Sequence, residues 1–293
     1  MISLIIPVFN EENAIEGTIR DAREHLQTTG EAFEILVVND GSTDDTLAKI
    51  HRCTGGSLRV ITHPRNLGYG ASMKTGIRHS TGDLLATVDA DGTYPLSAFP
   101  KLIGVLRERQ VDMVVGARTK RGVQIPLIRR PAKWIVNTLA NILTGMRIPD
   151  LNSGMRVFRR ELAERFMHLY PQKFSFTITL TLAALTNDYL VEYIPIDYHK
   201  RIGQSSLSQG MNGIRNFLNF LGLIVRITTY FRPLKFFALP SILLLIGGVT
   251  TILYTLKTTT NISDSGLLLL LTGLQIGLFG LLAEGVSRHR HHP

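Results

Sequence analysis

The first 110 residues alternate between short apolar runs and segments of helical periodicity. Short runs rich in β-branched residues predict strands, and apolar residues that recur every three or four positions predict helices. This alternation predicts an α/β fold in which a mostly parallel sheet is flanked by helices. Strands are expected at Ser3–Phe9, Phe33–Val38, Leu58–Thr62 and Asp83–Val88, with helices at Ala14–Leu26, Asp45–Arg52 and Gly70–His79.

The pattern is less regular in the next hundred residues. Strands are expected at Met113–Gly116 and Leu190–Tyr198, and a helix at Phe174–Leu185. Asp150–Phe158 has turn and strand character. Ligands of such sheets bind at the carboxyl ends of the strands, so polar residues that follow strands are the first candidates for function.

Charged residues nearly vanish after about residue 235. None occurs at Phe236–Leu256 or at Gly266–Ala283, and a short polar loop, Lys257–Ser265, joins the two stretches. About twenty residues of helix cross the hydrocarbon core of a bilayer. Buried core helices of a soluble protein are the alternative, but two adjacent stretches favour a two-helix transmembrane hairpin.

Basic residues flank this hairpin on both sides. Under the positive-inside rule they place both termini and the soluble domain in the cytoplasm. The N-terminal segment has no basic lead and no small-residue cleavage site, so it predicts a first strand and not a signal peptide. The basic residues are Arg215, Arg226, Arg232 and Lys235 before the hairpin, and Arg288 and Arg290 after it.

The formal net charge of the chain is +9. Nucleic acid, anionic lipid and a phosphorylated substrate can each explain such a charge. Because two membrane spans are predicted and no nucleic-acid-binding motif is present, the last two are favoured and no nucleic acid is expected. Cys53 is the only cysteine, which excludes a disulfide within the chain and a cysteine-rich metal site.

The strongest candidate for chemistry is Asp89-Ala90-Asp91, directly after the strand expected at Asp83–Val88. Two carboxylates at this spacing can converge on one hard divalent cation. Mg²⁺ or Mn²⁺ then completes its shell with water and substrate phosphates. The alternative is a solvated turn, since many surface loops contain this pattern. Its position at the end of a buried-type strand favours the metal site.

Two other strands also end in polar residues. Asp40 is placed to accept hydrogen bonds from a base or a ribose hydroxyl. A turn followed by a helix that Asp44 caps is the structural alternative, and both can hold at once. At the first strand, Pro7 fixes the loop, Phe9 could contact a base and Glu11 could reach ribose.

In order and spacing these motifs resemble glycosyltransferase family 2, whose GT-A fold is a single nucleotide-sugar-binding α/β domain. With the C-terminal hairpin, the chain is similar to dolichol-phosphate mannosyltransferase and to bacterial polyprenyl-phosphate glycosyltransferases. Those enzymes move a sugar from a nucleotide onto an isoprenoid phosphate. The motifs are PVFNEE at Pro7–Glu12, VVNDGSTD at Val37–Asp44, NLGYGASMKTGI at Asn66–Ile77, DADGTYP at Asp89–Pro95, GAR at Gly116–Arg118 and SGMRVF at Ser153–Phe158.

The resemblance and the charge pattern together divide the chain into four parts. A GT-A catalytic domain is expected at residues 1–210 and amphipathic interfacial helices at 211–235. Two transmembrane helices are expected at 236–284 and a basic cytoplasmic tail at 285–293.

The resemblance also implies roles for individual residues. Asp89 and Asp91 would hold the metal, and Asp91, Arg118 and Arg201 would be catalytic. Arg118 would lie by the sugar or the acceptor phosphate, and Arg201 near the diphosphate. Nucleotide-sugar contacts are implied for Pro7, Phe9, Glu11, Val38, Asp40, Asp89 and Ala90.

Two positions depart from the mannosyltransferase-like pattern. Thr93 stands where that pattern has Gln near the metal, and Ser206 stands where it has Lys in a late loop. UDP-glucose and GDP-mannose are therefore both kept as donors.

A lipid phosphate acceptor is already anionic at neutral pH, so it can attack the anomeric carbon without a general base. A cation on the diphosphate and arginines near the acceptor would offset the charge of two anions. A single in-line displacement predicts inversion at the sugar. Six basic residues are candidates for the acceptor phosphate or the membrane surface, with a solvated loop as the alternative: Arg118, Lys120, Arg121, Arg129, Arg130 and Lys133.

Two other functions stay open. A transferase with a hydroxyl acceptor, such as a glycan or a glycolipid, needs a general base, for which an acidic residue at 150–153 is the candidate. A catalytically silent membrane scaffold would keep the fold and lose the metal. Gly273 and Gly277 form a G-x-x-x-G pattern that allows close helix packing, so a homo-oligomer is a further expectation, although the pattern is common by chance.

Overall fold

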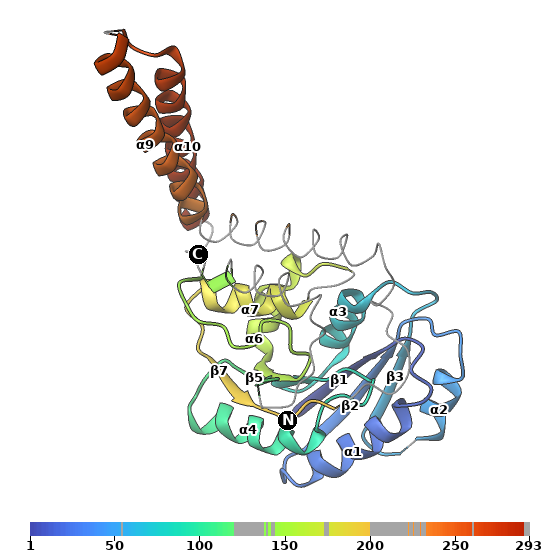
Figure 1. Cartoon of the computed structure of the whole chain (residues 1–293). Coiled ribbons are helices and arrows are strands. Elements are labelled where there is room, and N and C mark those ends of the chain that lie inside the picture. The colour runs from blue at the N-terminus through green and yellow to red at the C-terminus, as the bar shows by residue number, and fades with distance from the viewer. Residues whose placement is uncertain are drawn as a thin grey trace.

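The computed structural model contains an α/β domain followed by a C-terminal helical hairpin (Figure 1). It describes residues 1–53, 55–119, 138, 140–141, 144–172, 176–199, 222, 225, 229, 233–259 and 261–289. The segment expected to form interfacial helices, 211–235, falls almost wholly outside these residues.

Within the described ranges, seven strands form one mixed sheet in the order β3-β2-β1-β4-β6-β5-β7. β1, β2, β3 and β4 are parallel, as are β5 and β7, whereas β6 is antiparallel to both of its neighbours. The strands are β1 (Ile2–Val8), β2 (Phe33–Asn39), β3 (Leu58–Thr62), β4 (Leu84–Thr87), β5 (Met113–Ala117), β6 (Arg156–Arg159) and β7 (Val191–Pro195).

Helices cover both faces of the sheet (Figure 1). α1 and α4 pack on one face with alternate residues of β1, such as Leu4 and Ile6, while α3, α6 and α7 pack on the other with Ile5. Every residue of β1 is buried, as expected for a central strand covered on both sides. The helices are α1 (Ile15–Gln27), α2 (Thr46–Arg52), α3 (Tyr69–His79), α4 (Phe99–Glu108), α6 (Arg160–Arg165) and α7 (Phe176–Thr186).

The reversed direction of β6 decides which residues lie at the edge of the sheet where β4 ends. Thr87, at the end of β4, pairs with Arg156, at the start of β6. The turn before β6 therefore lies beside the loop that follows β4. A sheet predicted only as mostly parallel does not indicate this neighbourhood.

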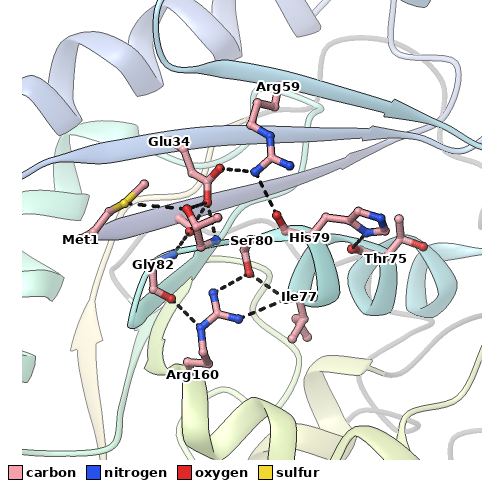
Figure 2. A network of polar contacts seen from close by, with 11 residues as sticks. Met1, Glu34, Arg59, Thr75, Ile77, His79, Ser80, Gly82 and Arg160 are labelled. Atoms are coloured by element: carbon pink, nitrogen blue, oxygen red, sulfur yellow. Dashed lines mark hydrogen bonds and ion pairs between the residues drawn. The ribbon is translucent and has the colours of Figure 1, made fainter.

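A polar network fastens the opposite edge of the sheet, at the amino ends of β1 and β2 (Figure 2). Glu34 is buried and accepts hydrogen bonds from Ser3 Oγ, from Thr81 and from Arg59 Nη1, at 2.6–2.7 Å. Arg160 donates to the Gly82 carbonyl at 2.7 Å. Burial alone would raise the pKa of Glu34, but these hydrogen bonds outweigh it and lower the pKa to about 2.

The C-terminal hairpin consists of α9 (Pro233–Thr259) and α10 (Asp264–His289). Both helices are long and apolar enough to cross a membrane, with mean hydropathies of 2.2 and 2.1. Only 11% and 17% of their most apolar windows are buried, so their leucines face outward where lipid would lie. α9 begins beside the α/β domain, because a Cβ on Gly145 would lie 3.3 Å from Lys235 Nζ.

Glycines and a serine let the two helices of the hairpin approach closely. A Cβ on Gly273 would lie 3.0 Å from Leu245 Cγ, and one on Gly277 would lie 2.8 Å from Ser241 Oγ. Ser241 Oγ also donates to the Gly273 carbonyl at 2.8 Å. The G-x-x-x-G pattern thus packs α10 against α9 of the same chain, and the expected homo-oligomer finds no support in it.

Candidate active site at the carboxyl edge of the sheet

The polar residues expected to carry function gather where the strands end. β4 ends at Thr87, and the chain then turns through Asp89 to Gly92, which has a φ of +70°. A positive φ costs glycine little, so this turn can follow the strand directly. Asp91 is 9% exposed, and Ala90 is buried with its carbonyl accepting a hydrogen bond from Thr18 Oγ1.

The two aspartates act on each other electrostatically. Burial, followed by the negative charge of Asp91, raises the pKa of Asp89 to about 6. The positive charges of Arg118 and Arg156 oppose this rise. Two carboxylates held close enough to repel fit a divalent cation, which would offset their charge.

The oxygen donors suit Mg²⁺ or Mn²⁺. In the part of the chain that the structure describes, no group of three or more His, Cys, Asp or Glu side chains gathers. A cation would therefore take two carboxylates from the protein and its other ligands from water and phosphate, as magnesium commonly does.

Thr93 fixes the orientation of Asp91. Both its main-chain N–H and its hydroxyl donate to Asp91 Oδ1, at 3.2 and 2.6 Å. The Thr93 carbonyl accepts a hydrogen bond from the His199 N–H at 2.8 Å, which ties the segment after β7 to the loop that follows β4. The residue that replaces Gln in the motif is thus buried and holds the second aspartate.

Arg118 is held in a fork by a buried carboxylate. Its Nε and Nη2 donate to the two oxygens of Asp150 at 2.7 and 2.9 Å, and its main-chain N–H donates at 3.0 Å. Its guanidinium also lies 5.2 Å from the centre of the Tyr198 ring. Burial alone would lower the pKa of Arg118, but the hydrogen bonds to Asp150 raise it, so the side chain keeps its charge.

This pairing bears on the expected general base. Asp150 is the acidic residue of the 150–153 segment, and it accepts three hydrogen bonds from Arg118 and one from the Asn152 N–H. A carboxylate bonded in this way is a poor proton acceptor, because taking a proton would break the ion pair.

Asp40 lies at the end of β2 and is 3% exposed. Its oxygens accept hydrogen bonds from His63 Nδ1 at 2.7 Å, from the Leu67 N–H at 2.9 Å and from the Gly68 N–H at 2.7 Å. Because a carboxylate cannot donate, His63 carries a proton on Nδ1. In this structure Asp40 fastens the loop before α3, and its expected contact with the nucleotide stays a prediction.

The other nucleotide-site candidates lie on the loops after β1 and β2. Pro7 is buried in β1, Phe9 is half-buried beyond its end, and the Glu11 N–H donates to Thr46 Oγ1 at 2.9 Å. The Val38 side chain is fully buried in the core, so only its main chain could meet a ligand.

Several candidates lie outside the described residues. These are Arg201, which was expected near the diphosphate, and most of the basic segment expected to meet the acceptor or the membrane: Lys120, Arg121, Arg129, Arg130 and Lys133.

Sequence reasoning gave no role to three residues that the structure brings to Asp89. Tyr94 is buried and Tyr69 is half-buried beside it, and its charge contributes to the raised pKa of both hydroxyls, after burial. Arg156 is fully buried below, in the SGMRVF motif. The SGMRVF motif marks this segment as a candidate for function. Its closeness to Asp89, however, follows from the antiparallel direction of β6, which the sequence pattern does not show.

Sequence models of two protein families match the chain. The one for glycosyl transferase family 2 matches residues 3–167, and the one for the GtrB C-terminal hairpin matches residues 232–289. Together with the apolar helices, the hairpin match marks the chain as a membrane protein.

Known proteins resemble the chain over most of its length. It is 27% identical over 299 residues to the dodecaprenyl-phosphate galacturonate synthase of Rhizobium johnstonii, covering 98% of this chain and 88% of that protein.

Solved structures share the fold. A glucosyl-3-phosphoglycerate synthase from Mycobacterium tuberculosis, in complex with Mn²⁺, UDP and glucosyl-3-phosphoglycerate, superposes with a TM-score of 0.60 at 19% identity, covering 78% of this chain and 80% of that one. S. aureus TarS residues 1–349, in complex with UDP-GlcNAc, superposes with a TM-score of 0.56 at 20% identity, covering 77% and 66%.

Proposed function

The chain belongs to glycosyltransferase family 2, and we propose that it transfers a sugar from a nucleotide-diphosphate sugar to a polyprenyl phosphate in the membrane. The observation that carries the proposal is the union, in one chain, of a glycosyltransferase domain with the GtrB-type hairpin. The relative from Rhizobium johnstonii matches 98% of this chain and is named a dodecaprenyl-phosphate galacturonate synthase, which supports this acceptor class.

The acceptor phosphate is the nucleophile in the proposed reaction. One of its oxygens bonds to the anomeric carbon while the bond from that carbon to the nucleoside diphosphate breaks, which inverts the sugar configuration. The phosphate is anionic at neutral pH, so no general base is required. This agrees with Asp150, whose carboxylate is engaged by Arg118 and is not set up to deprotonate a hydroxyl.

Asp89 and Asp91 would hold a divalent cation, which, when bound, would act as a Lewis acid on the leaving diphosphate. Arg118 keeps its charge at the same edge, where a fixed guanidinium can stabilise phosphate oxygens. Arg201 and the basic segment, together with the nucleotide contacts of Pro7, Phe9, Glu11, Val38, Asp40 and Ala90, complete the proposed site.

The donor in this proposal is a nucleotide sugar of the UDP-glucose or the GDP-mannose type. The substitution of Thr93 for the Gln of the mannosyltransferase-like pattern keeps both open, and Thr93 holds Asp91 instead of facing the edge.

A transfer assay tests the proposal. Purified full-length protein in detergent is incubated with Mn²⁺ or Mg²⁺, undecaprenyl phosphate and labelled UDP-glucose, GDP-mannose or UDP-galacturonate, and label is followed into the organic phase. We expect metal-dependent label with one donor, none when undecaprenol replaces its phosphate, and at least a ~100-fold loss in Asp91→Asn. Asp21→Asn, on the surface of α1, is the matched control and should retain activity.

Label on undecaprenol, or no lipid label from any donor, would contradict the proposed acceptor. Full activity in Asp91→Asn would contradict the proposed metal site.

A further inference from the structure

Gly154 occupies the turn before β6, next to the first aspartate of the proposed metal site. A Cβ built on Gly154 would lie 2.5 Å from Asp89 Oδ2, 2.6 Å from Oδ1 and 2.7 Å from Cγ. Real Cβ atoms essentially never approach other heavy atoms so closely. The Asp89 carboxyl group thus rests directly on the α-carbon of Gly154, in the space that any other residue would fill.

The backbone of this turn is held from several directions. Thr87 Oγ1 donates to the Gly154 carbonyl at 2.7 Å, and the Gly154 N–H donates to Tyr94 Oη at 2.7 Å. Arg156 Nε donates to the Ser153 carbonyl at 3.1 Å, and Arg156 Nη2 donates to the same oxygen. A turn fixed in this way cannot retreat easily from an added methyl group.

Arg156 is fully buried, and a buried guanidinium is costly unless its donors are satisfied. Its Nη1 donates to the Thr177 carbonyl and to Thr181 Oγ1, both at 3.0 Å, so the side chain links α7 to the turn. The position of the turn is therefore anchored in the core of the domain.

We propose that Gly154 is a positioning residue that sets the place of the Asp89 carboxylate. Tyr94 and Arg156 hold the turn that contains Gly154 in position. This inference rests on the proposed metal-dependent transfer. A methyl group at residue 154 would push aside the short Asp89 side chain and leave the anchored backbone in place. We therefore expect a folded protein in which the Asp89 carboxylate is displaced from its proposed position at the metal ion.

Mn²⁺ binding to the purified full-length chain, measured by electron paramagnetic resonance without donor or lipid, tests the inference. We expect Gly154→Ala to weaken Mn²⁺ binding by about 10- to 100-fold, the range for lost support of a metal ligand. Gly104→Ala in α4 is the matched control, since a Cβ there meets nothing within 4 Å, and it should bind as wild type. Circular dichroism and a thermal melt establish that each variant is folded.

A double variant separates positioning from a general distortion of the turn. Asp89→Ala removes the carboxyl group, so Gly154→Ala then has nothing to displace and should not weaken the residual Mn²⁺ binding further. A further loss in the double variant would overturn the inference in favour of a merely structural role.

Tyr94→Phe loosens the turn without adding volume, which keeps the inference testable if Gly154→Ala does not fold. It removes the acceptor of the Gly154 N–H, and we expect severalfold weaker Mn²⁺ binding. Unchanged Mn²⁺ binding in the folded variants would overturn the positioning role proposed for Gly154. The proposed transfer reaction would not be affected by that result. A wild-type chain that binds no Mn²⁺ would instead contradict the metal site itself, and the inference with it.

Discussion

Single hydroxyl groups do much of the positioning at the candidate site. Thr93 shows this most clearly, because its side chain donates to Asp91 Oδ1 at 2.6 Å and its carbonyl is bonded to the segment after β7. The residue is 1% exposed, so it acts through Asp91 and not by touching substrate.

Replacing the Thr93 hydroxyl should therefore lower metal affinity. Thr93→Val keeps the shape and removes the donor, and we expect Mn²⁺ activation of transfer to need about tenfold more metal. Thr93→Ser keeps the hydroxyl and should stay close to wild type. The metal concentration at half-maximal activity is the measurement, and equal values for the Val and Ser variants would contradict the role given to the hydroxyl.

At this scale the position of the acidic pair was predictable, whereas its role as a metal site stays a prediction. Asp89 and Asp91 directly follow a buried strand, as expected from their place in the sequence. The role of Gly154 was not predictable, since it depends on the contact of its α-carbon with Asp89 across two strands. The partner of Arg118 was equally hidden, because Asp150 lies 32 residues away in the sequence.

At the scale of elements, the two edges of the sheet have opposite electrostatic characters. The carboxyl edge holds aspartates whose charges repel, and the amino edge holds Glu34 in a network of donors (Figure 2). The repulsion between Asp89 and Asp91 thus lies at the edge where a bound cation would offset it.

The Glu34 network should stabilise the fold in a pH-dependent way. The pKa of Glu34 is lowered on folding from 4.5 to about 2, so its contribution is present above about pH 4.5 and is lost as the pH falls toward 2. At pH 7 we expect Glu34→Gln to destabilise the domain by about 2 kcal/mol. The difference in melting temperature from wild type should shrink from pH 5 to pH 3.

Glu24→Gln, on the exposed face of α1, is the control for this titration and should not differ from wild type at any pH. A difference in melting temperature between Glu34→Gln and wild type that stays constant down to pH 3 would contradict this prediction. It would show that the hydrogen bonds do not stabilise the ionised form of the Glu34 carboxylate.

The hairpin gives a second prediction at this scale, with neighbouring glycines as a matched pair. A Cβ on Gly248 would lie 2.7 Å from Leu270 Cγ and 2.9 Å from the Gly266 carbonyl, whereas one on Gly247 meets only Leu269 Cδ1, at 4.0 Å. Gly248→Leu should therefore separate α9 from α10 and lower the melting temperature in detergent, while Gly247→Leu should be tolerated. Equal melting temperatures for the two variants would contradict the packing.

The sequence predicted these elements unevenly. β1 to β5 and both apolar helices were expected because their patterns are strong and local. α4 was not predicted, although its buried residues Phe99, Leu102, Ile103 and Leu106 have helical spacing. The antiparallel direction of β6 was not predictable either, because direction is set by the path of the chain and not by the pattern of a four-residue strand.

For the whole molecule, the hairpin links the site to the membrane. α9 begins beside Gly145 of the α/β domain, and the end of α10 returns to the same level, where the Leu234 N–H donates to Glu284 Oε2 at 3.3 Å. Both ends of the hairpin therefore lie beside the domain, which predicts that they share one side of the membrane with it. The basic residues around them predict that this side is the cytoplasm.

Cysteine labelling in intact bacterial cells tests this orientation, because Cys53 is the only native cysteine and can be replaced by Ser. Asn261→Cys, exposed between α9 and α10, should react with a membrane-impermeant maleimide added outside, whereas Thr28→Cys, exposed on the α/β domain, should react only after the cells are opened. The opposite pattern would place the domain outside the cell, away from cytoplasmic nucleotide sugars, and would contradict the proposed donor. Labelling of neither cysteine before lysis would show that the hairpin does not cross the membrane.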